Sequence, residues 1–412
     1  MKAFWKVCLS ALLLGFVVIP AQAADAPTTT NDAAESAFIL AHEQWRSAAV
    51  ATLASSKDAD SLYAAAYLAG ASLDNAHTED KDDLRKSQQT SLDYLDQAAA
   101  LAPNAADIAA RALMLCDQIS ACDLAVYADR YRTAAPDDAR VWLPALQRAQ
   151  KQHDETNVTA ILQSMGAAQS FGSYQVAAAQ RLQRGLAHVS PSPSFDDAVT
   201  SMDYDESFRE QMATVLSSVQ ASAMAASITM PAFGSLNKAC KPTLAVFAQR
   251  RSACRSVGLL LEQNGSYLNR RIGLLLHRRA ADSDTDRAAA IASGRRLDWQ
   301  SKQYYSKLAS NVTAMAGASQ PTPKQAHALL ATTVSYMDAV REHHGEIPGI
   351  QALLVHAGLP LEPPADWIDK NQQYRLADDR RIAKHAQAQA ESAQTSQSGA
   401  CHASKPPSPS KP

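Results

Sequence analysis

The chain has 412 residues and a formal net charge of −2 at pH 7, so neither strong acidity nor strong basicity characterises it as a whole. Alanine dominates the composition, while aromatic residues make up only 6%. β-Strands favour β-branched and aromatic residues in alternation, and this chain shows no convincing run of that kind. Apolar residues recur instead at spacings of three and four, as in Leu92, Leu95, Ala98 and Ala99. We therefore expect an all-α protein.

The N-terminal segment 1–23 has the layout of a secretory signal peptide. Lys2 and Lys6 form a positive start, an apolar stretch runs from Val7 to Ile19, and the small residues Ala21 and Ala23 follow. This layout predicts cleavage after Ala23 and export, in a bacterium to the periplasm or the outside of the cell. No later apolar run reaches the roughly 20 residues of a membrane span.

Export implies an oxidising compartment, in which paired cysteines form disulfides. Cys116 and Cys122 are separated by the short connection 117–121 between two predicted helices, so we expect them to pair. A metal site or a redox-active pair is a weaker alternative, because no C-x-x-C motif and no close set of histidines accompanies them.

Cys240 and Cys254 are harder to pair from the sequence. One continuous helix from Pro242 through Cys254 would hold the two cysteines about 18 Å apart and forbid a bond. A break in the helix at 249–252 would permit it. We favour the break and the bond; the remaining Cys401 lies in the C-terminal tail.

An internal repeat has copies on both sides of Cys116 and Cys122. LAPNAADIAARAL (101–113) and AAPDDARVWLPAL (134–146) align without a gap, and AAQSFGSYQVAAA (167–179) is a weaker third copy at the same offset. Pro103 aligns with Pro136, and the following Asn104 and Asp137 are expected to cap helices. Pro144 would interrupt a helix unless it marks a late start.

A period of about 34 residues with a proline at each junction resembles the tetratricopeptide repeat, a stack of antiparallel helical hairpins. The resemblance implies a solenoid over 24–187 that acts as a scaffold or adaptor for a protein or peptide partner. Candidate partner-binding residues are the aromatic side chains of a possible groove: Tyr127, Tyr131, Trp142 and Tyr174. The alternative for each of them, which we favour, is packing in the core.

The rest of the chain divides by composition. A linker rich in Pro, Ser and Asp is expected at 188–205, and a second α-helical domain at 206–372. Within that domain we expect a loop over 230–242, helices up to about 282 and over 287–315 and 324–343, and a short helix over 350–356. The tail 373–412 is rich in Ala, Gln, Ser, Lys and Pro, a composition typical of disorder.

Charge is unevenly distributed between the two parts. Residues 24–220 carry about 27 acidic against 14 basic residues, whereas 238–307 carry about 14 basic against 5 acidic. The basic part could form an anion-binding face, or its arginines could simply be solvated or pair with the acidic part. Nucleic acid is disfavoured, because aromatic residues are not interleaved and the protein is expected to be exported. The candidate anion-binding residues are Arg250, Arg251, Arg270, Arg271, Arg278 and Arg279.

No catalytic signature stands out. His343, His344 and Glu346 lack the spacing of the H-E-x-x-H zinc motif, and we place the histidines at the end of a helix. We therefore expect a protein that is not an enzyme and has neither cofactor nor metal: an exported adaptor of the cell envelope. The alternative is an envelope hydrolase on an all-helical core at 205–370, which a convergence of titratable groups would favour. The sequence does not predict the oligomeric state.

Overall fold

The computed structural model describes residues 32–70, 81–190, 233–310 and 323–367. Within these ranges all regular elements are helices, apart from an isolated bridge between Asp138 and Ser170, so the all-α prediction is confirmed. The predicted signal peptide, most of the predicted linker 188–205 and the predicted tail 373–412 lie outside the described residues. No helix in the described ranges is both long and apolar enough to cross a membrane.

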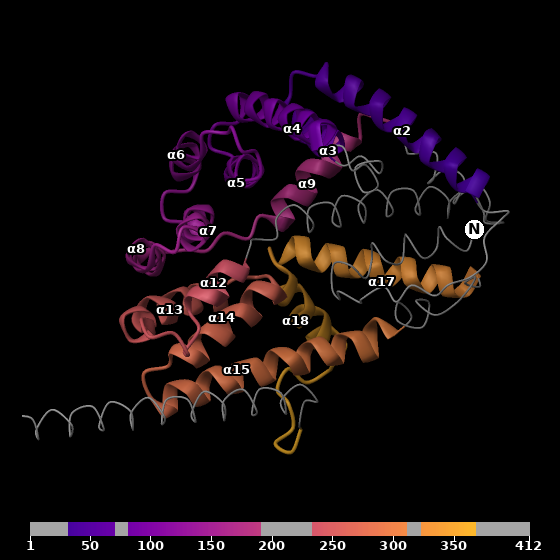
Figure 1. Cartoon of the computed structure of the whole chain (residues 1–412). Helices are drawn as coiled ribbons and strands as arrows, with labels where there is room; N and C mark the ends of the chain where they lie inside the picture. The colour runs from indigo at the N-terminus through magenta and orange to yellow at the C-terminus, as the bar shows by residue number, and fades with distance from the viewer. Residues whose placement is uncertain (1–31, 71–80, 191–232, 311–322, 368–412) are drawn as a thin grey trace, which may run out of the picture.

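Figure 1 shows the helices following one another around an arc. The N-terminal end of the arc is a core shared by α2, α3, α4, α5 and α9 (Gln175–Leu186), in which Ala64, Ala65 and Ala98 are completely buried. These small side chains let neighbouring helices approach closely, which explains the alanine-rich composition. The elements of this end are α2 (Asp32–Ala54), α3 (Ala59–Gly70), α4 (Lys81–Leu101), α5 (Ala106–Cys116) and α6 (Leu124–Ala134).

The two stronger copies of the repeat occupy equivalent places in the stack. Pro103 lies between α4 and α5, and Pro136 lies between α6 and the short 3-10 helix η2 (Ala139–Trp142). η2 leads into α7 (Leu143–Lys151), which has Pro144 in its first turn, so this proline does mark a late start. Both capping predictions were wrong by one residue: the N-cap of α5 is Ala105, and the N-cap of η2 is Asp138.

The third copy of the repeat does not add another helical hairpin after α7 and α8 (Glu155–Ala167). After α8, helix α9 turns back and packs against α3 and α5. Ala178 and Leu182 are completely buried there, and a Cβ on Gly185 would clash with the backbone carbonyl of Asp60. The stack of hairpins is therefore closed by a helix of the same chain.

The C-terminal part consists of further packed helix pairs. The predicted loop over 230–242 contains helix α12, because Phe233, Leu236 and Ala239 recur at helical spacing and are all buried. The predicted helix 350–356 begins earlier, at Glu346. The elements are α12 (Phe233–Ala239), α13 (Phe247–Glu262), α14 (Tyr267–Ala280), α15 (Asp284–Gln303), the π-helical turn η3 (Tyr304–Leu308), α17 (Pro323–Glu342) and α18 (Glu346–His356).

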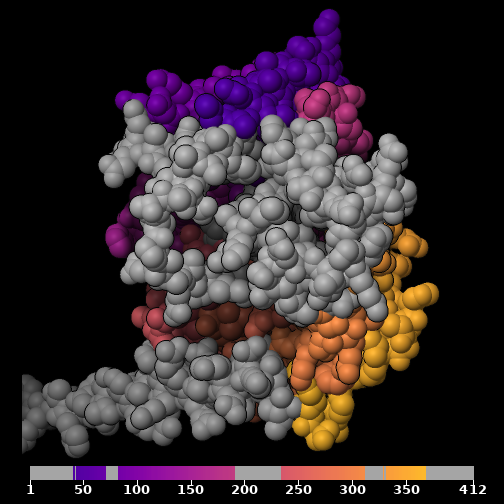
Figure 2. All heavy atoms as spheres, turned by 90° about the vertical axis from the view of Figure 1, so that its right-hand side faces the viewer, coloured from indigo at the N-terminus to yellow at the C-terminus, as the bar shows by residue number. Residues whose placement is uncertain are grey.

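One hydrophobic core extends across the predicted domain boundary. Leu146 of α7 and Leu162 of α8 belong to the same cluster as Leu236, Val257 and Leu276 of α12, α13 and α14. The described helices on the two sides of the predicted linker are therefore not two separate cores. The arc is nevertheless long: in Figure 2, the indigo atoms of α2 and the yellow atoms that follow α17 lie at opposite ends of the molecule.

Candidate functional site

Both predicted disulfides are present. Cys116 and Cys122 have their Cα atoms 5.4 Å apart, and their bond joins the end of α5 to the turn that leads into α6. Cys240 and Cys254 also pair, with Cα atoms 5.7 Å apart. The predicted reason for the second bond was wrong, since α13 runs through 249–252 without a break. The chain reverses earlier, in the turns between Ala239 and Phe247.

The four aromatic residues of the predicted groove do not form one surface. Tyr131 is only 1% exposed and belongs to the core, so it cannot line an open groove. Tyr127 donates to Asp96 of α4 at 2.9 Å. Trp142 is partly buried under the guanidinium of Arg132, 5.1 Å from the ring centroid.

Tyr131 and Tyr174 meet at a buried carboxylate that the sequence analysis missed. Asp138 is 2% exposed and accepts hydrogen bonds from the Tyr131 and Tyr174 hydroxyls, as well as from the backbone N–H groups of Arg140 and Gly172. Four donors satisfy the charge, so its burial is tolerated. The carboxylate fastens the segment before α9 to α6 and η2, and gives both tyrosines a structural role.

The six arginines of the predicted anion-binding face also separate. Arg250 is 1% exposed and donates to Glu155 at 2.5 Å, so a base of the basic part pairs with an acid of the acidic part. Arg278 is 6% exposed, Arg279 donates to Asn237, and Arg271 donates to the Tyr267 hydroxyl.

The other two arginines of that set do not restore an open face. Arg251 is exposed, and Arg270 is partly buried. Burial lowers the pKa of the Arg270 guanidinium, and the nearby Glu262 opposes that effect. Of these six arginines, Arg250 is the one for which the described residues show pairing with the acidic part.

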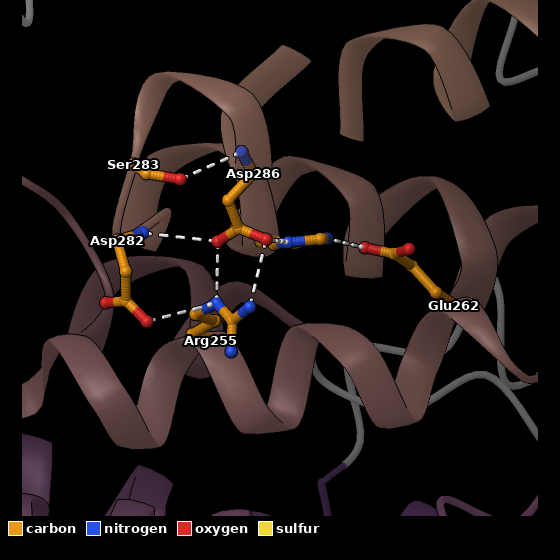
Figure 3. A network of polar contacts seen from close by, with 6 residues as sticks. Arg255, Glu262, Asp282, Ser283 and Asp286 are labelled. Atoms are coloured by element: carbon orange, nitrogen blue, oxygen red, sulfur yellow. Dashed lines mark hydrogen bonds and ion pairs between the residues drawn. The ribbon is translucent and has the colours of Figure 1, made fainter. Parts of the chain in front are cut away.

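A polar network ties α13, α14 and α15 together (Figure 3). His277 lies between two carboxylates, with Nδ1 2.6 Å from Glu262 Oε1 and Nε2 2.8 Å from Asp286 Oδ1. Arg255 donates to both oxygens of Asp286, at 2.7 and 2.9 Å. The imidazole ring therefore bridges two carboxylates through both of its nitrogens.

Two glycines make this network possible. A Cβ on Gly258 would lie 2.7 Å from the backbone nitrogen of His277, and one on Gly273 would lie 2.6 Å from that of Glu262. Without side chains at these positions, α13 and α14 approach closely enough for Glu262 and His277 to meet.

The network has a structural rather than a catalytic geometry. His277 is 5% exposed, and each charged group contacts another member of the network. The hydrogen bonds from Arg255 and His277 hold the pKa of Asp286 well below its usual range, whereas burial raises the pKa of Glu262 against the opposing effect of His277. In the described part of the chain, no group of three or more His, Cys, Asp and Glu side chains could hold a metal ion.

A second cluster surrounds a single glutamate at the start of α18. Glu346 Oε2 accepts the backbone N–H of Tyr267 at 2.8 Å, so this carboxylate caps α14 from another element. Burial raises the pKa of Glu346 to about 7, and the carboxylate has electrostatic contact with Tyr304, Tyr305 and Tyr336. The predicted helix end at His343 and His344 lies just before it, in an exposed turn.

The most distinctive group of aromatic, cationic and thioether side chains lies on α3, α5, η2 and the residue before α9. We call it the inner cluster, and it consists of Tyr63, Tyr67, Arg111, Met114, Arg140 and Tyr174. Arg140 donates to the Met114 sulfur at 2.9 Å, and its guanidinium lies 5.5 Å from the centroid of the Tyr174 ring. Tyr67, Arg111, Met114 and Tyr174 are partly exposed, whereas Tyr63 and Arg140 are buried.

Arg111 has an unusual environment in this cluster. Its natural partner on the same helix is Asp107, one turn earlier. Both oxygens of Asp107 instead accept from Arg181 of α9, at 2.7 and 3.2 Å. Burial lowers the pKa of Arg111, and the neighbours that oppose this effect are the tyrosines Tyr63 and Tyr67. No carboxylate of the described residues pairs with Arg111.

No protein-family model, curated protein or solved structure matches the chain, so the interpretation of these sites depends on their own geometry.

Proposed function

We propose that the protein is an exported, non-catalytic helical scaffold that binds a protein or peptide partner of the cell envelope through the inner cluster. The supporting observation is that side chains of three kinds are partly exposed in this cluster: the guanidinium of Arg111, the rings of Tyr67 and Tyr174, and the thioether of Met114. Arginine, aromatic residues and methionine are the residue types enriched in protein interfaces. The tetratricopeptide-like repeat belongs to this proposal, since the described helices stack in pairs as such repeats do.

The framework under the cluster is rigid in a way that suits recognition. The Cys116–Cys122 bond closes the α5–α6 hairpin, and Asp138 joins α6 and η2 to the segment before α9. A surface that is already ordered loses less entropy when a partner binds. The same two features explain how a core of small side chains can hold its surface residues in place.

Export is part of the proposal and has its own test. The positive start and the apolar stretch within the segment 1–23 support it, and two disulfides suit an oxidising compartment. We expect the N-terminus of the protein recovered from the periplasm or the medium to be Ala24. Retention of Met1 in the recovered protein would contradict export through a cleaved signal peptide.

Site-specific cross-linking in living cells tests partner binding. We expect a photo-reactive amino acid at Tyr67, in the inner cluster, to give a discrete adduct with an envelope protein or peptide. The matched control is the same amino acid at Leu84 of α4, which is 42% exposed and not part of the cluster. Equal adducts at both positions, or none at Tyr67, would contradict the proposal.

The alternative, an envelope hydrolase, has one observation in its favour. Glu346 has a pKa near 7, the value that suits a general acid at neutral pH. Its hydrogen bond to the Tyr267 N–H already gives it a capping role, so we favour the scaffold. Release of soluble fragments from purified cell wall, abolished by Glu346→Gln, would favour the hydrolase instead.

A further inference from the structure

We infer that Arg111 and the Tyr63 hydroxyl form a binding site for a carboxylate group, supplied by an acidic side chain of a peptide partner. This inference depends on the proposed function and deepens it, because it names the chemical group that the inner cluster recognises. Two independent observations support it, one on each side chain.

The first observation is that Arg111 has no acidic partner among the described residues. A guanidinium that is partly removed from water is normally paired with an acid, because an uncompensated buried charge is costly. Here the acid one turn away, Asp107, is held by two hydrogen bonds from Arg181, which also pairs with Asp60. Helix α9 thus removes the usual partner of Arg111, and no other carboxylate in the described ranges replaces it.

The second observation is the hydroxyl of Tyr63. The residue is 1% exposed, and its hydroxyl oxygen is buried without a hydrogen-bond partner among the described residues. Buried hydroxyl groups in folded proteins nearly always have a partner, so an exception needs an explanation. The strongest electrostatic neighbour of this hydroxyl is the carboxylate of Asp107, which Arg181 already pairs. The guanidinium groups of Arg111, Arg181 and Arg140 are its other neighbours, so positive charge outweighs negative charge around it, as an anion requires.

The two groups are electrostatic neighbours of each other. Tyr63 and Tyr67 lie one turn apart on α3, and Arg111 on α5 has electrostatic contact with both. Arg111 offers the planar array of donors that matches a carboxylate, and the Tyr63 hydroxyl offers one more. Met114 and Tyr174 provide apolar and aromatic contacts beside them, so an acidic residue within a peptide fits better than a free anion.

Calorimetric titration of the purified full-length protein tests the inference with three probes. These are an acetylated tri-glutamate peptide, its tri-glutamine counterpart and inorganic phosphate. We expect the wild type to bind the glutamate peptide, and at least ten times more tightly than the glutamine peptide. We expect Arg111→Gln to weaken binding of the glutamate peptide at least tenfold. Tyr63→Phe should weaken it about fivefold while the thermal unfolding temperature stays the same or rises, since it removes a buried unsatisfied group.

The matched control is Arg85→Gln, which removes the same charge from an exposed arginine of α4. An equal loss of binding in this variant would show attraction by net charge only and would overturn the inference. Should Arg111→Gln fail to fold, Tyr63→Phe decides alone, and unchanged binding in it overturns the inference. Arg111-dependent binding of phosphate without binding of the glutamate peptide would also overturn it, because the ligand would then be a small anion.

Two further outcomes separate this inference from the proposed function. An adduct at Tyr67 together with wild-type peptide affinity in Arg111→Gln would overturn the carboxylate site and leave the scaffold in place. Arg111-dependent peptide binding without any adduct at Tyr67 would support the site and contradict the cellular partner. If no probe binds the wild type but Arg111→Gln lowers its stability, the chain itself satisfies Arg111, and the inference is wrong.

Discussion

Glu346→Gln is expected to stabilise the protein at alkaline pH and to leave its stability unchanged at acid pH. The pKa of Glu346 rises from an ordinary 4.5 to about 7 in the folded protein, because burial penalises the charged form. Below pH 4.5 the carboxyl is protonated in both the folded and the unfolded chain. As the pH rises to 7 and beyond, Glu346 ionises more readily in the unfolded chain than in the folded protein. The free energy of unfolding of the wild type therefore falls. The full difference is about 3 kcal/mol, from 1.36 kcal/mol per pKa unit.

Glutamine imitates the protonated acid over the whole pH range. Its amide oxygen can still accept the Tyr267 N–H, so the cap on α14 is kept. We therefore expect Glu346→Gln to be more stable than the wild type by about 2–3 kcal/mol at pH 8, and equal to it at pH 4.5. Urea unfolding followed by circular dichroism at pH 4.5, 6, 7 and 8 measures this difference.

The control for this prediction is Glu342→Gln, since Glu342 is an exposed glutamate at the end of α17. We expect it to differ from the wild type by less than about 0.5 kcal/mol at every pH. A Glu346→Gln variant that is no more stable at pH 8 than at pH 4.5, relative to the wild type, would refute the reasoning. Such a result would mean that ionisation of Glu346 does not destabilise the folded wild type.

Three further changes test the packing. Gly185→Ala should destabilise the protein by about 3 kcal/mol, because its methyl group meets backbone of α3, whereas Gly234→Ala, with open space around it, should be neutral or stabilise by up to about 1 kcal/mol. Equal urea midpoints for the two variants would contradict the close contact of α9. His277→Ala should cost about 3–5 kcal/mol, since it leaves two carboxylates without their shared partner, and a loss smaller than about 1 kcal/mol would speak against the network. Replacing Cys240 and Cys254 by serine should cost about 3 kcal/mol for a loop of this size, and unchanged stability would argue against a constraining bond.

Local features of the fold could be predicted from the sequence because their causes are local. The spacing of apolar residues predicts the helices, and the aligned Pro103 and Pro136 do fall at equivalent junctions. The short connection between Cys116 and Cys122 keeps the two cysteines close together, so their bond could be predicted. Pairing of Arg250 with the acidic part was one of the alternatives, although no pattern could identify Glu155 as the acid.

The misses that concern the candidate sites involve contacts between distant segments. Tyr131 looks the same in a sequence whether it faces a groove or a buried Asp138, and this choice depends on where the segment before α9 returns. The packing of α9 against α3 requires a glycine at position 185, because a Cβ there would clash with the Asp60 carbonyl. The sequence alone does not show that Asp60 lies next to it. Arg111 could not be identified either, because the acid one turn away from it, Asp107, pairs with Arg181, which lies far along the chain on α9.

The core that α7 and α8 share with α12, α13 and α14 determines how the chain can be divided for experiments. A fragment that stops before Phe233 would leave the apolar sides of α7 and α8 in contact with water, and a fragment that starts there would do the same to α13. Neither half is an independently folding domain, and we expect either half to aggregate when it is expressed alone. The change in amino-acid composition near residue 190 therefore does not mark a boundary between two parts that fold independently.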